Sequence, residues 1–332
     1  MALDKRKVST FFDSEPARRR LETFIDNGDC YPLHVVLHLT DFCNHQCNFC
    51  SNPYNTHGSE RQLHTLDAQD VIKYIKEFKE LGVNNLVISG GGEPLLHKDI
   101  ERVLEEVIYS RVPASLYTNL DINLSPKLIQ QLSLLSVGIN LNTLEPLLYK
   151  STRGKNSNLE RVKENIRLLQ DLDTPPTALV IVKDDTARSL KSTVKSLLEM
   201  GLGGITVSSA FDLPYADKIT ATRKTLDAME RLKTQDLPGV RVLSPVEQSV
   251  KVDGRVVCKS HYFDITIGAD YGVYPCCMTA YIREYQLFNL RDYLSFKDAW
   301  QSEARKRTIE EFQASCKNCW FAPLNKVLSE DE

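Results

Sequence analysis

Apolar residues along this chain alternate between short continuous runs and stretches with a helical period. The continuous runs predict strands at 34–39, 85–89, 114–118, 138–142, 177–182 and 204–208. The periodic stretches predict helices near 67–81, 98–110, 125–134, 158–171, 187–200 and 221–233. Apolar strands that alternate regularly with helices are typical of a parallel sheet covered by helices, so the pattern predicts an α/β fold.

Three cysteines follow the first predicted strand with the spacing C-x₃-C-x₂-C: Cys43, Cys47 and Cys50. Three thiolates on one loop can hold three irons of a 4Fe–4S cluster and leave the fourth iron without a protein ligand. The alternatives are a zinc site or three unrelated buried thiols. Structural zinc usually takes four protein ligands, and only one local set of three is present here. The spacing therefore favours a cluster.

A glycine-rich turn follows the second predicted strand, where three glycines precede Glu93 and Pro94. Glycines at a strand end let backbone groups approach a ligand closely, because no Cβ lies in the way. The turn offers main-chain groups and a carboxylate to a ligand ammonium group. Glycine turns between a strand and a helix are common, so this turn alone is weak evidence for a ligand site. Its place one strand–helix unit after the cysteine loop makes the evidence strong.

The cysteine loop and this turn resemble the motifs of the radical S-adenosylmethionine (SAM) superfamily. The resemblance covers about residues 32–210 and implies a partial (β/α)₆ barrel in which the three cysteines hold a 4Fe–4S cluster. SAM would chelate the open iron, with Gly91, Gly92 and Glu93 at its amino group and Phe49 near its adenine. The reduced cluster would cleave SAM to methionine and a 5′-deoxyadenosyl radical, which takes a hydrogen atom from the substrate.

Further polar residues follow the third and fourth predicted strands. Barrels of this type bind ligands at the carboxyl ends of their strands. The resemblance implies contacts from these positions to the ribose and carboxylate of SAM, and arginine can form a bidentate pair with a carboxylate. Ordinary loop capping is the alternative. The candidates are Thr118, Asn119, Asn140, Asn142 and Arg153.

A second group of cysteines lies in the last third of the chain. The stretches 265–270, 273–277, 288–300 and 316–320 resemble the auxiliary-cluster domains of radical SAM enzymes, called SPASM or, when shortened, twitch. Four thiolates would saturate a second 4Fe–4S cluster, and a zinc ribbon is the alternative. The predicted ligands are Cys258, Cys276, Cys316 and Cys319, with Cys277 as the alternative to Cys276.

The cysteine that is left over near the second cluster has two interpretations. A free thiol beside a substrate radical can donate a hydrogen atom, as in the epimerases of this family. More often a spare cysteine is a small buried apolar residue. Cys277 is accordingly the candidate catalytic residue, ahead of Cys30.

Composition narrows the class of protein. The net charge of −3 gives no electrostatic reason to expect nucleic acid or an anionic membrane as a partner. The chain begins without an apolar signal region and has no run of eighteen apolar residues. Nine cysteines in such a chain of 332 residues are better explained as metal ligands in a reducing cytoplasm than as disulfides. We therefore expect a cytoplasmic protein.

The expected organisation is a helical extension at 1–31, the barrel at 32–210, a linker at 211–250 and the auxiliary-cluster domain at 251–332. This layout is similar to that of 2-deoxy-scyllo-inosamine dehydrogenase. About thirty residues precede the first strand, too few for a leader-peptide domain, so we expect a small polar substrate such as a sugar, aminocyclitol or nucleotide-linked intermediate.

The predicted activity is therefore oxidation of that substrate by a radical SAM oxidoreductase, with the second cluster as electron acceptor. A reductase, flavodoxin or ferredoxin would supply electrons. Epimerisation, decarboxylation and peptide modification remain open, as does a non-catalytic metal-binding scaffold. A GTP cyclase of the molybdopterin pathway would need an open auxiliary iron, and four cysteine ligands argue against it.

Overall fold

The structure is a computed structural model. It describes residues 12–52, 63–170, 173–210, 221–243, 250–251, 258–311, 316, 318–319 and 321–329. Among these residues no helix combines the length and apolar character that crossing a bilayer requires.

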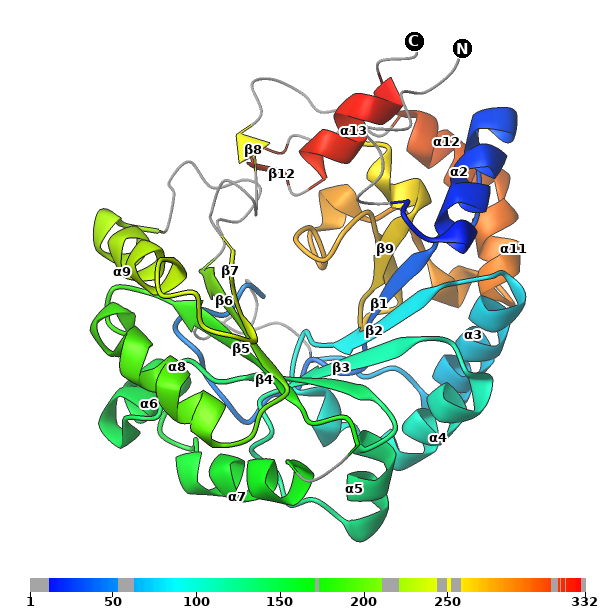
Figure 1. Cartoon of the computed structure of the whole chain (residues 1–332). Coiled ribbons are helices and arrows are strands. Elements are labelled where there is room, and N and C mark those ends of the chain that lie inside the picture. Colours follow the sequence, from blue (N-terminus) through cyan, green and yellow to red (C-terminus); the bar gives the residue numbers. More distant parts are fainter. Residues whose placement is uncertain are drawn as a thin grey trace.

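A ten-stranded sheet with the order β11-β10-β9-β1-β2-β3-β4-β5-β6-β7 forms the centre of the molecule and curves into an incomplete barrel (Figure 1). Strands β1 to β7 and β9 pair in parallel, and β10 and β11 continue the β9 edge with antiparallel pairs. The strands are β1 (His34–His38), β2 (Asn85–Ser89), β3 (Ala114–Thr118), β4 (Ser136–Asn140), β5 (Thr177–Val182), β6 (Gly204–Ser209), β7 (Val240–Val242), β9 (Asp264–Ile267), β10 (Gly272–Tyr274) and β11 (Phe288–Asn289). A separate antiparallel pair joins β8 (Val250–Lys251) to β12 (Asn318–Cys319).

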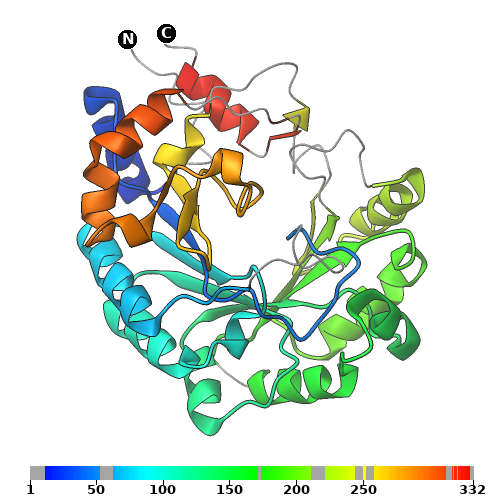
Figure 2. The same cartoon turned by 180° about the vertical axis from the view of Figure 1, so that it is seen from behind.

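Helices cover the outer side of the curved sheet, as both views show (Figures 1 and 2). Several begin where the sequence places a capping residue: the side chain of Ser125 accepts from Leu128 N, and that of Asp67 accepts from Gln69 N. The helices are α2 (Glu15–Asn27), α3 (Ala68–Glu80), α4 (Ile100–Ser110), α5 (Pro126–Leu132), α6 (Pro146–Arg153), α7 (Leu159–Leu169), α8 (Leu190–Glu199), α9 (Arg223–Lys233), α11 (Phe296–Gln301), α12 (Glu303–Glu311) and α13 (Ala322–Ser329).

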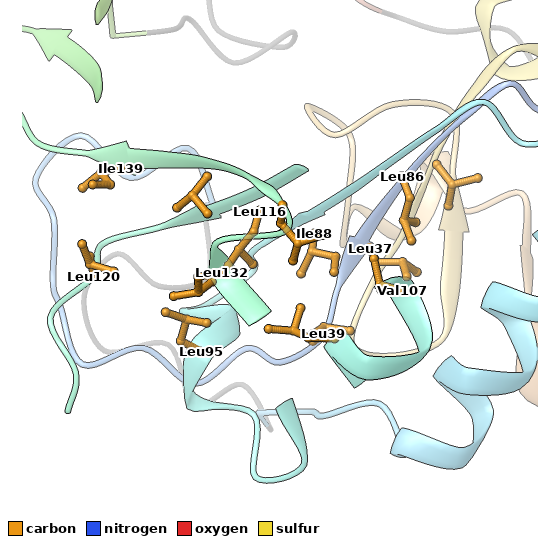
Figure 3. Packing of buried hydrophobic residues seen from close by; sticks show 14 of the residues in the cluster. Leu37, Leu39, Leu86, Ile88, Leu95, Val107, Leu116, Leu120, Leu132 and Ile139 are labelled. Atoms are coloured by element: carbon orange, nitrogen blue, oxygen red, sulfur yellow. The ribbon is translucent and has the colours of Figure 1, made fainter. Parts of the chain in front are cut away.

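The hydrophobic core lies between the sheet and this helical layer. Leu37, Leu86 and Leu116 come from three adjacent strands and are fully buried, and Val107 of α4 packs in the same cluster (Figure 3). Burying one such side chain stabilises the fold by roughly 1.5–3 kcal/mol. The strands are thereby held rigidly, and their carboxyl ends can position a site.

The predicted α/β fold with a parallel sheet is confirmed, and so are the six predicted strands. The fourth strand lies two residues earlier than predicted, at Ser136–Asn140. The backbone changes there because the side chain of Asn142 accepts from Ile181 N, at 3.3 Å, where a strand would pair through its main chain.

The C-terminal part of the chain joins the same sheet. Strand β9 pairs in parallel with β1, in a register that runs from His34 opposite Asp264 to Leu37 opposite Ile267. The sequence analysis placed these two strands in different domains, and that division stays a prediction. The pairing places the strand that precedes Cys276 and Cys277 next to the strand that leads into the cysteine loop.

Candidate functional site

A cavity of about 520 Å³ opens at the carboxyl ends of the barrel strands. The loop after β1, the turn after β2 and the ends of β3 to β6 all contribute to its wall. A larger hollow of about 630 Å³ lies between α2 and α11, and it holds none of the predicted ligand residues. The cavity at the strand ends is therefore the candidate site.

The cysteine loop lies along this cavity, and Cys43, Cys47 and Cys50 all line it. The end of α6 holds the loop from one side, because Gln46 N donates to Arg153 O at 2.9 Å. A second hydrogen bond to the end of α6 runs from Asn48 N to Thr152 O, also at 2.9 Å. The residues that follow β3 also support the loop.

The support from the residues after β3 is a buried hydrogen-bond network of His45, Asn44 and Asp121, which the sequence analysis missed. His45 Nε2 lies 2.9 Å from Asp121 Oδ2, and Asn44 Nδ2 donates to Asp121 O at 2.7 Å. Burial lowers the pKa of His45, so the ring is neutral and Nε2–H donates to the carboxylate. The only sequence signal was the place of His45 between two cysteines.

The three thiols of the loop fit an iron–sulfur cluster by their chemistry. Burial raises the pKa of Cys43 to about 12 and that of Cys50 to about 11, and it also raises the pKa of Cys47. Bound metal replaces these thiol protons. Within the described residues no three His, Cys, Asp or Glu side chains are placed to hold one metal ion. In a cluster each cysteine binds a different iron, so the three thiols need not converge on one ion.

The glycine turn packs directly against the cysteine loop. Glu93 N donates to Phe42 O at 2.8 Å, and a Cβ on Gly92 would lie only 2.0 Å from that oxygen. Gly92 and Glu93 line the cavity. Gly91 is not among the lining residues, and its carbonyl accepts from Asn52 Nδ2 at 2.7 Å.

Glu93 is buried at the ends of β2 and β3. Its carboxylate accepts from Thr118 Oγ1 at 2.6 Å, from Asn119 N at 2.7 Å and from Leu95 N at 3.0 Å. Burial raises the pKa of Glu93, and these hydrogen bonds oppose the rise. Thr118 and Asn119 line the cavity, and their contact with SAM stays a prediction. The Thr118 hydroxyl and the Asn119 backbone N–H already donate to Glu93.

Arg153 places a buried positive charge at the cavity, 1% exposed at the end of α6. Its Nη2 donates to Asn140 O at 2.6 Å, to Asn140 Oδ1 at 2.8 Å and to Asn142 Oδ1 at 3.3 Å. The guanidinium carbon lies 5.0 Å from the ring centre of Phe49. Asn140, Phe49 and Arg153 line the cavity, whereas Asn142 is not among the lining residues.

The cavity wall also contains two residues that the sequence analysis did not single out, His38 at the end of β1 and Tyr281. Their rings stack with centres 5.6 Å apart, and His38 Nδ1 lies 3.2 Å from Tyr281 Oη. The same hydroxyl is hydrogen-bonded to Asp41. Burial lowers the pKa of His38 to about 4, so the ring is neutral. The sequence analysis considered polar residues at the carboxyl ends of strands, such as Thr118, and the same reasoning applied to the first strand would have identified His38.

The C-terminal cysteines divide between two environments. Cys258, Cys276, Cys316 and Cys319 lie near one another: burial raises the pKa of Cys316 to about 12, and the other three thiols add to the rise. Cys277 instead lines the cavity, with Met278, Ala280 and Tyr281. The two adjacent cysteines thus face different sites.

Two family models match the chain. The model of the radical SAM superfamily matches residues 37–197, and that of the iron–sulfur cluster-binding SPASM domain matches residues 258–320. The chain contains a radical SAM domain followed by a SPASM domain.

Curated relatives of this chain are named for several activities. GTP 3′,8-cyclase of Aquifex aeolicus is 36% identical over 77 residues, covering 23% of this chain and 24% of that protein. A probable GTP 3′,8-cyclase of Methanococcus maripaludis is 28% identical over 169 residues, 50% of this chain and 55% of its own length. The chain thus spans about a quarter and about half of these two relatives. PqqA peptide cyclase of Bradyrhizobium diazoefficiens is 26% identical, covering 94% of this chain and 83% of that protein.

Solved structures share the fold. SuiB of Streptococcus suis, bound to its precursor peptide SuiA, has a TM-score of 0.68 at 14% identity and covers 89% of this chain and 71% of its own. The enzyme anSMEcpe with bound AdoMet and Cp18Cys peptide has a TM-score of 0.61 at 18% identity, over 89% and 88%. BtrN, the 2-deoxy-scyllo-inosamine dehydrogenase, has a TM-score of 0.45 at 14% identity, too low to support the specific similarity expected from the sequence.

Proposed function

We propose that this chain is a radical SAM enzyme that takes a hydrogen atom from a small polar substrate and completes its oxidation by passing one electron to a second iron–sulfur cluster. The observation that carries the proposal is the arrangement around one cavity. The cysteine loop and Cys277 both line it, and Cys277 is next in sequence to Cys276 of the second cysteine group.

In this proposal Cys43, Cys47 and Cys50 hold the first 4Fe–4S cluster. When bound, that cluster would supply the electron that cleaves SAM to methionine and a 5′-deoxyadenosyl radical. The protein groups around it suit the parts of SAM. Glu93 would face the amino group and Arg153 the carboxylate, as opposite charges require.

Thr118, Asn119, Asn140 and Asn142 would act mainly by fixing those two charged side chains, which they contact directly. Phe49 would lie near the adenine. Gly91 would act by letting the turn pack on the cysteine loop, since a Cβ there would lie 2.4 Å from Asp41 Oδ1.

The rest of the cavity wall supports a polar, uncharged substrate. Among the described lining residues Glu93 and Arg153 carry charge, both near the cysteine loop, and the remaining polar groups are neutral. The hydroxyl of Ser208 is buried without a hydrogen-bond partner among the described residues, so a ligand hydroxyl could satisfy it. Besides Ser51 and Thr118, the hydroxyl-bearing lining residues are Ser89, Tyr117, Thr177, Thr206, Ser208 and Tyr281. A sugar or aminocyclitol offers the complementary groups.

A second candidate function is epimerisation, and the exposed thiol of Cys277 in the cavity favours it. In that reaction the thiol would return a hydrogen atom to the substrate radical from the face opposite the 5′-deoxyadenosyl group. The resulting thiyl radical would take one electron from a reduced flavodoxin or ferredoxin, by way of the second cluster, and one proton from solvent. Peptide substrates are a further alternative, because SuiB and anSMEcpe are solved with bound peptides and PqqA peptide cyclase aligns with most of this chain.

Anaerobic reconstitution tests the proposal. We expect about eight irons per chain and release of 5′-deoxyadenosine when dithionite and SAM are added. Bound zinc with no SAM cleavage would instead support a non-catalytic scaffold. Candidate sugars, aminocyclitols and peptides that carry deuterium at one carbon would then be screened for transfer of that deuterium into 5′-deoxyadenosine.

Turnover in deuterated water separates the two outcomes. Oxidation yields a product two hydrogens poorer, with no solvent deuterium on the reacting carbon. Epimerisation through Cys277 places solvent deuterium there, and Cys277→Ala would abolish this incorporation while 5′-deoxyadenosine still forms. If the wild-type protein and the Cys277→Ala variant both form the oxidised product, Cys277 has no catalytic role.

A further inference from the structure

Each thiol of the C-terminal cysteine group has a side-chain hydrogen-bonding partner of its own. Four different residues provide these contacts, three through hydroxyls and one through an amide. Ser260 Oγ lies 3.3 Å from Cys258 Sγ, Thr279 Oγ1 lies 3.6 Å from Cys276 Sγ, Asn325 Nδ2 lies 3.6 Å from Cys319 Sγ, and Tyr285 is hydrogen-bonded to Cys316. We call Ser260, Thr279, Tyr285 and Asn325 the donor shell.

The donor shell is buried and fixed in place. Asn325 of α13 is 3% exposed, and its Oδ1 accepts from Lys259 N and Ser260 N, both at 2.8 Å. These two hydrogen bonds fix the orientation of the Asn325 amide, so that Nδ2 points toward Cys319 Sγ. Thr279 is the weakest member, because its single proton also faces Cys276 O at 3.0 Å.

The loop that would hold the first cluster has fewer side-chain contacts of this kind. Cys43 Sγ accepts from the backbone N of His45 at 3.4 Å, and Cys50 is hydrogen-bonded to the backbone of Asn52. Among these three thiols Cys47 alone has a side-chain partner among the described residues, the guanidinium of Arg153. A centre held by four thiolates carries one more negative charge than a centre held by three, and this charge makes it a poorer electron acceptor. Hydrogen bonds to the ligand sulfurs stabilise the more negative reduced state and raise the reduction potential.

We propose that Ser260, Thr279, Tyr285 and Asn325 offset the charge of the fourth thiolate and set the second cluster to accept an electron from the substrate. The inference rests on the proposed oxidation. There, a substrate H–C–O–H group gives its carbon-bound hydrogen atom to the 5′-deoxyadenosyl radical. The remaining carbon radical then loses its hydroxyl proton to a base and one electron to the second cluster, which leaves a carbonyl. An oxidised flavodoxin or ferredoxin must later remove that electron.

The test measures the midpoint potential of the second cluster by redox titration followed by electron paramagnetic resonance. The full-length chain carries Cys43→Ala, Cys47→Ala and Cys50→Ala, so that a single cluster gives the signal and neither SAM nor substrate is needed. Into this parent we introduce Tyr285→Phe and Ser260→Ala, each of which removes one hydroxyl and little else.

Each of the two substitutions is expected to shift the midpoint to a more negative potential without loss of iron, and the double variant should shift it further. Ser260→Thr keeps a hydroxyl and should restore the parent value. Tyr293→Phe is the matched control, since its hydroxyl contacts Ser302 instead of a cysteine. It should leave the midpoint unchanged.

Two results would overturn the inference, and they are distinguishable. An unchanged or more positive midpoint in the Tyr285→Phe and Ser260→Ala variants, with iron retained, contradicts the donor shell and leaves the proposed function standing. Absence of any cluster from the parent protein contradicts the second cluster itself, and the proposed function with it.

Discussion

Replacement of Cys43, Cys47 and Cys50 by alanine is expected to abolish SAM cleavage and to remove about half of the bound iron. The three thiols line the cavity on one loop, and no other described cysteine of the radical SAM domain lines it. Cleavage is measured as 5′-deoxyadenosine released after addition of dithionite and SAM, and iron is measured per chain.

Cys30→Ala provides the matched control for this triple variant. The thiol of Cys30 is buried away from the cavity and donates to Tyr262 O at 3.4 Å. Its loss should leave the iron content and the rate of SAM cleavage close to those of wild type. Retained cleavage in the triple variant would refute the assignment of these three ligands.

The double variant Cys316→Ala and Cys319→Ala is expected to lose about half of the iron and yet to cleave SAM. The cysteine loop is supported by α6 and by the end of β3, through bonds such as Gln46 N to Arg153 O and Asn44 Nδ2 to Asp121 O. These supports do not involve the C-terminal group, so the first site should survive.

In the same double variant, substrate oxidation should fail even though 5′-deoxyadenosine forms. The carbon radical then has no acceptor for its electron within the protein. The ratio of oxidised product to 5′-deoxyadenosine is the measurement, and it should fall at least tenfold, which corresponds to about 1.4 kcal/mol in the competing steps. Unchanged iron in this variant would remove the second cluster from the account.

Much of the fold could be predicted because its strands are short apolar runs between clear turns. Strands β2, β3 and β5 have the predicted bounds for this reason. The pairing of β9 with β1 could not be predicted, because periodicity shows which residues are buried but not which distant strand they meet. His34 and Asp264 are paired in the sheet although more than two hundred residues separate them.

In the candidate site, too, residues in local motifs could be predicted, whereas contacts between distant segments could not. The resemblance of local motifs to a known family drew attention to Glu93 and Arg153, and both side chains line the cavity. The network of His45 with Asp121 depends on the packing of β3 against the cysteine loop and has no local signature. The different surroundings of Cys276 and Cys277 also depend on the folded backbone, so the sequence left the choice between them open.

The central claim is that the first cluster has one iron free for SAM, and one measurement tests it most directly. SAM labelled isotopically at its amino nitrogen and carboxylate carbon is added to the reduced Cys316→Ala and Cys319→Ala variant, in which only the first cluster gives a signal. Electron–nuclear double resonance should then show hyperfine coupling of both labelled nuclei to the cluster. A full-strength cluster signal with neither coupling would contradict the account.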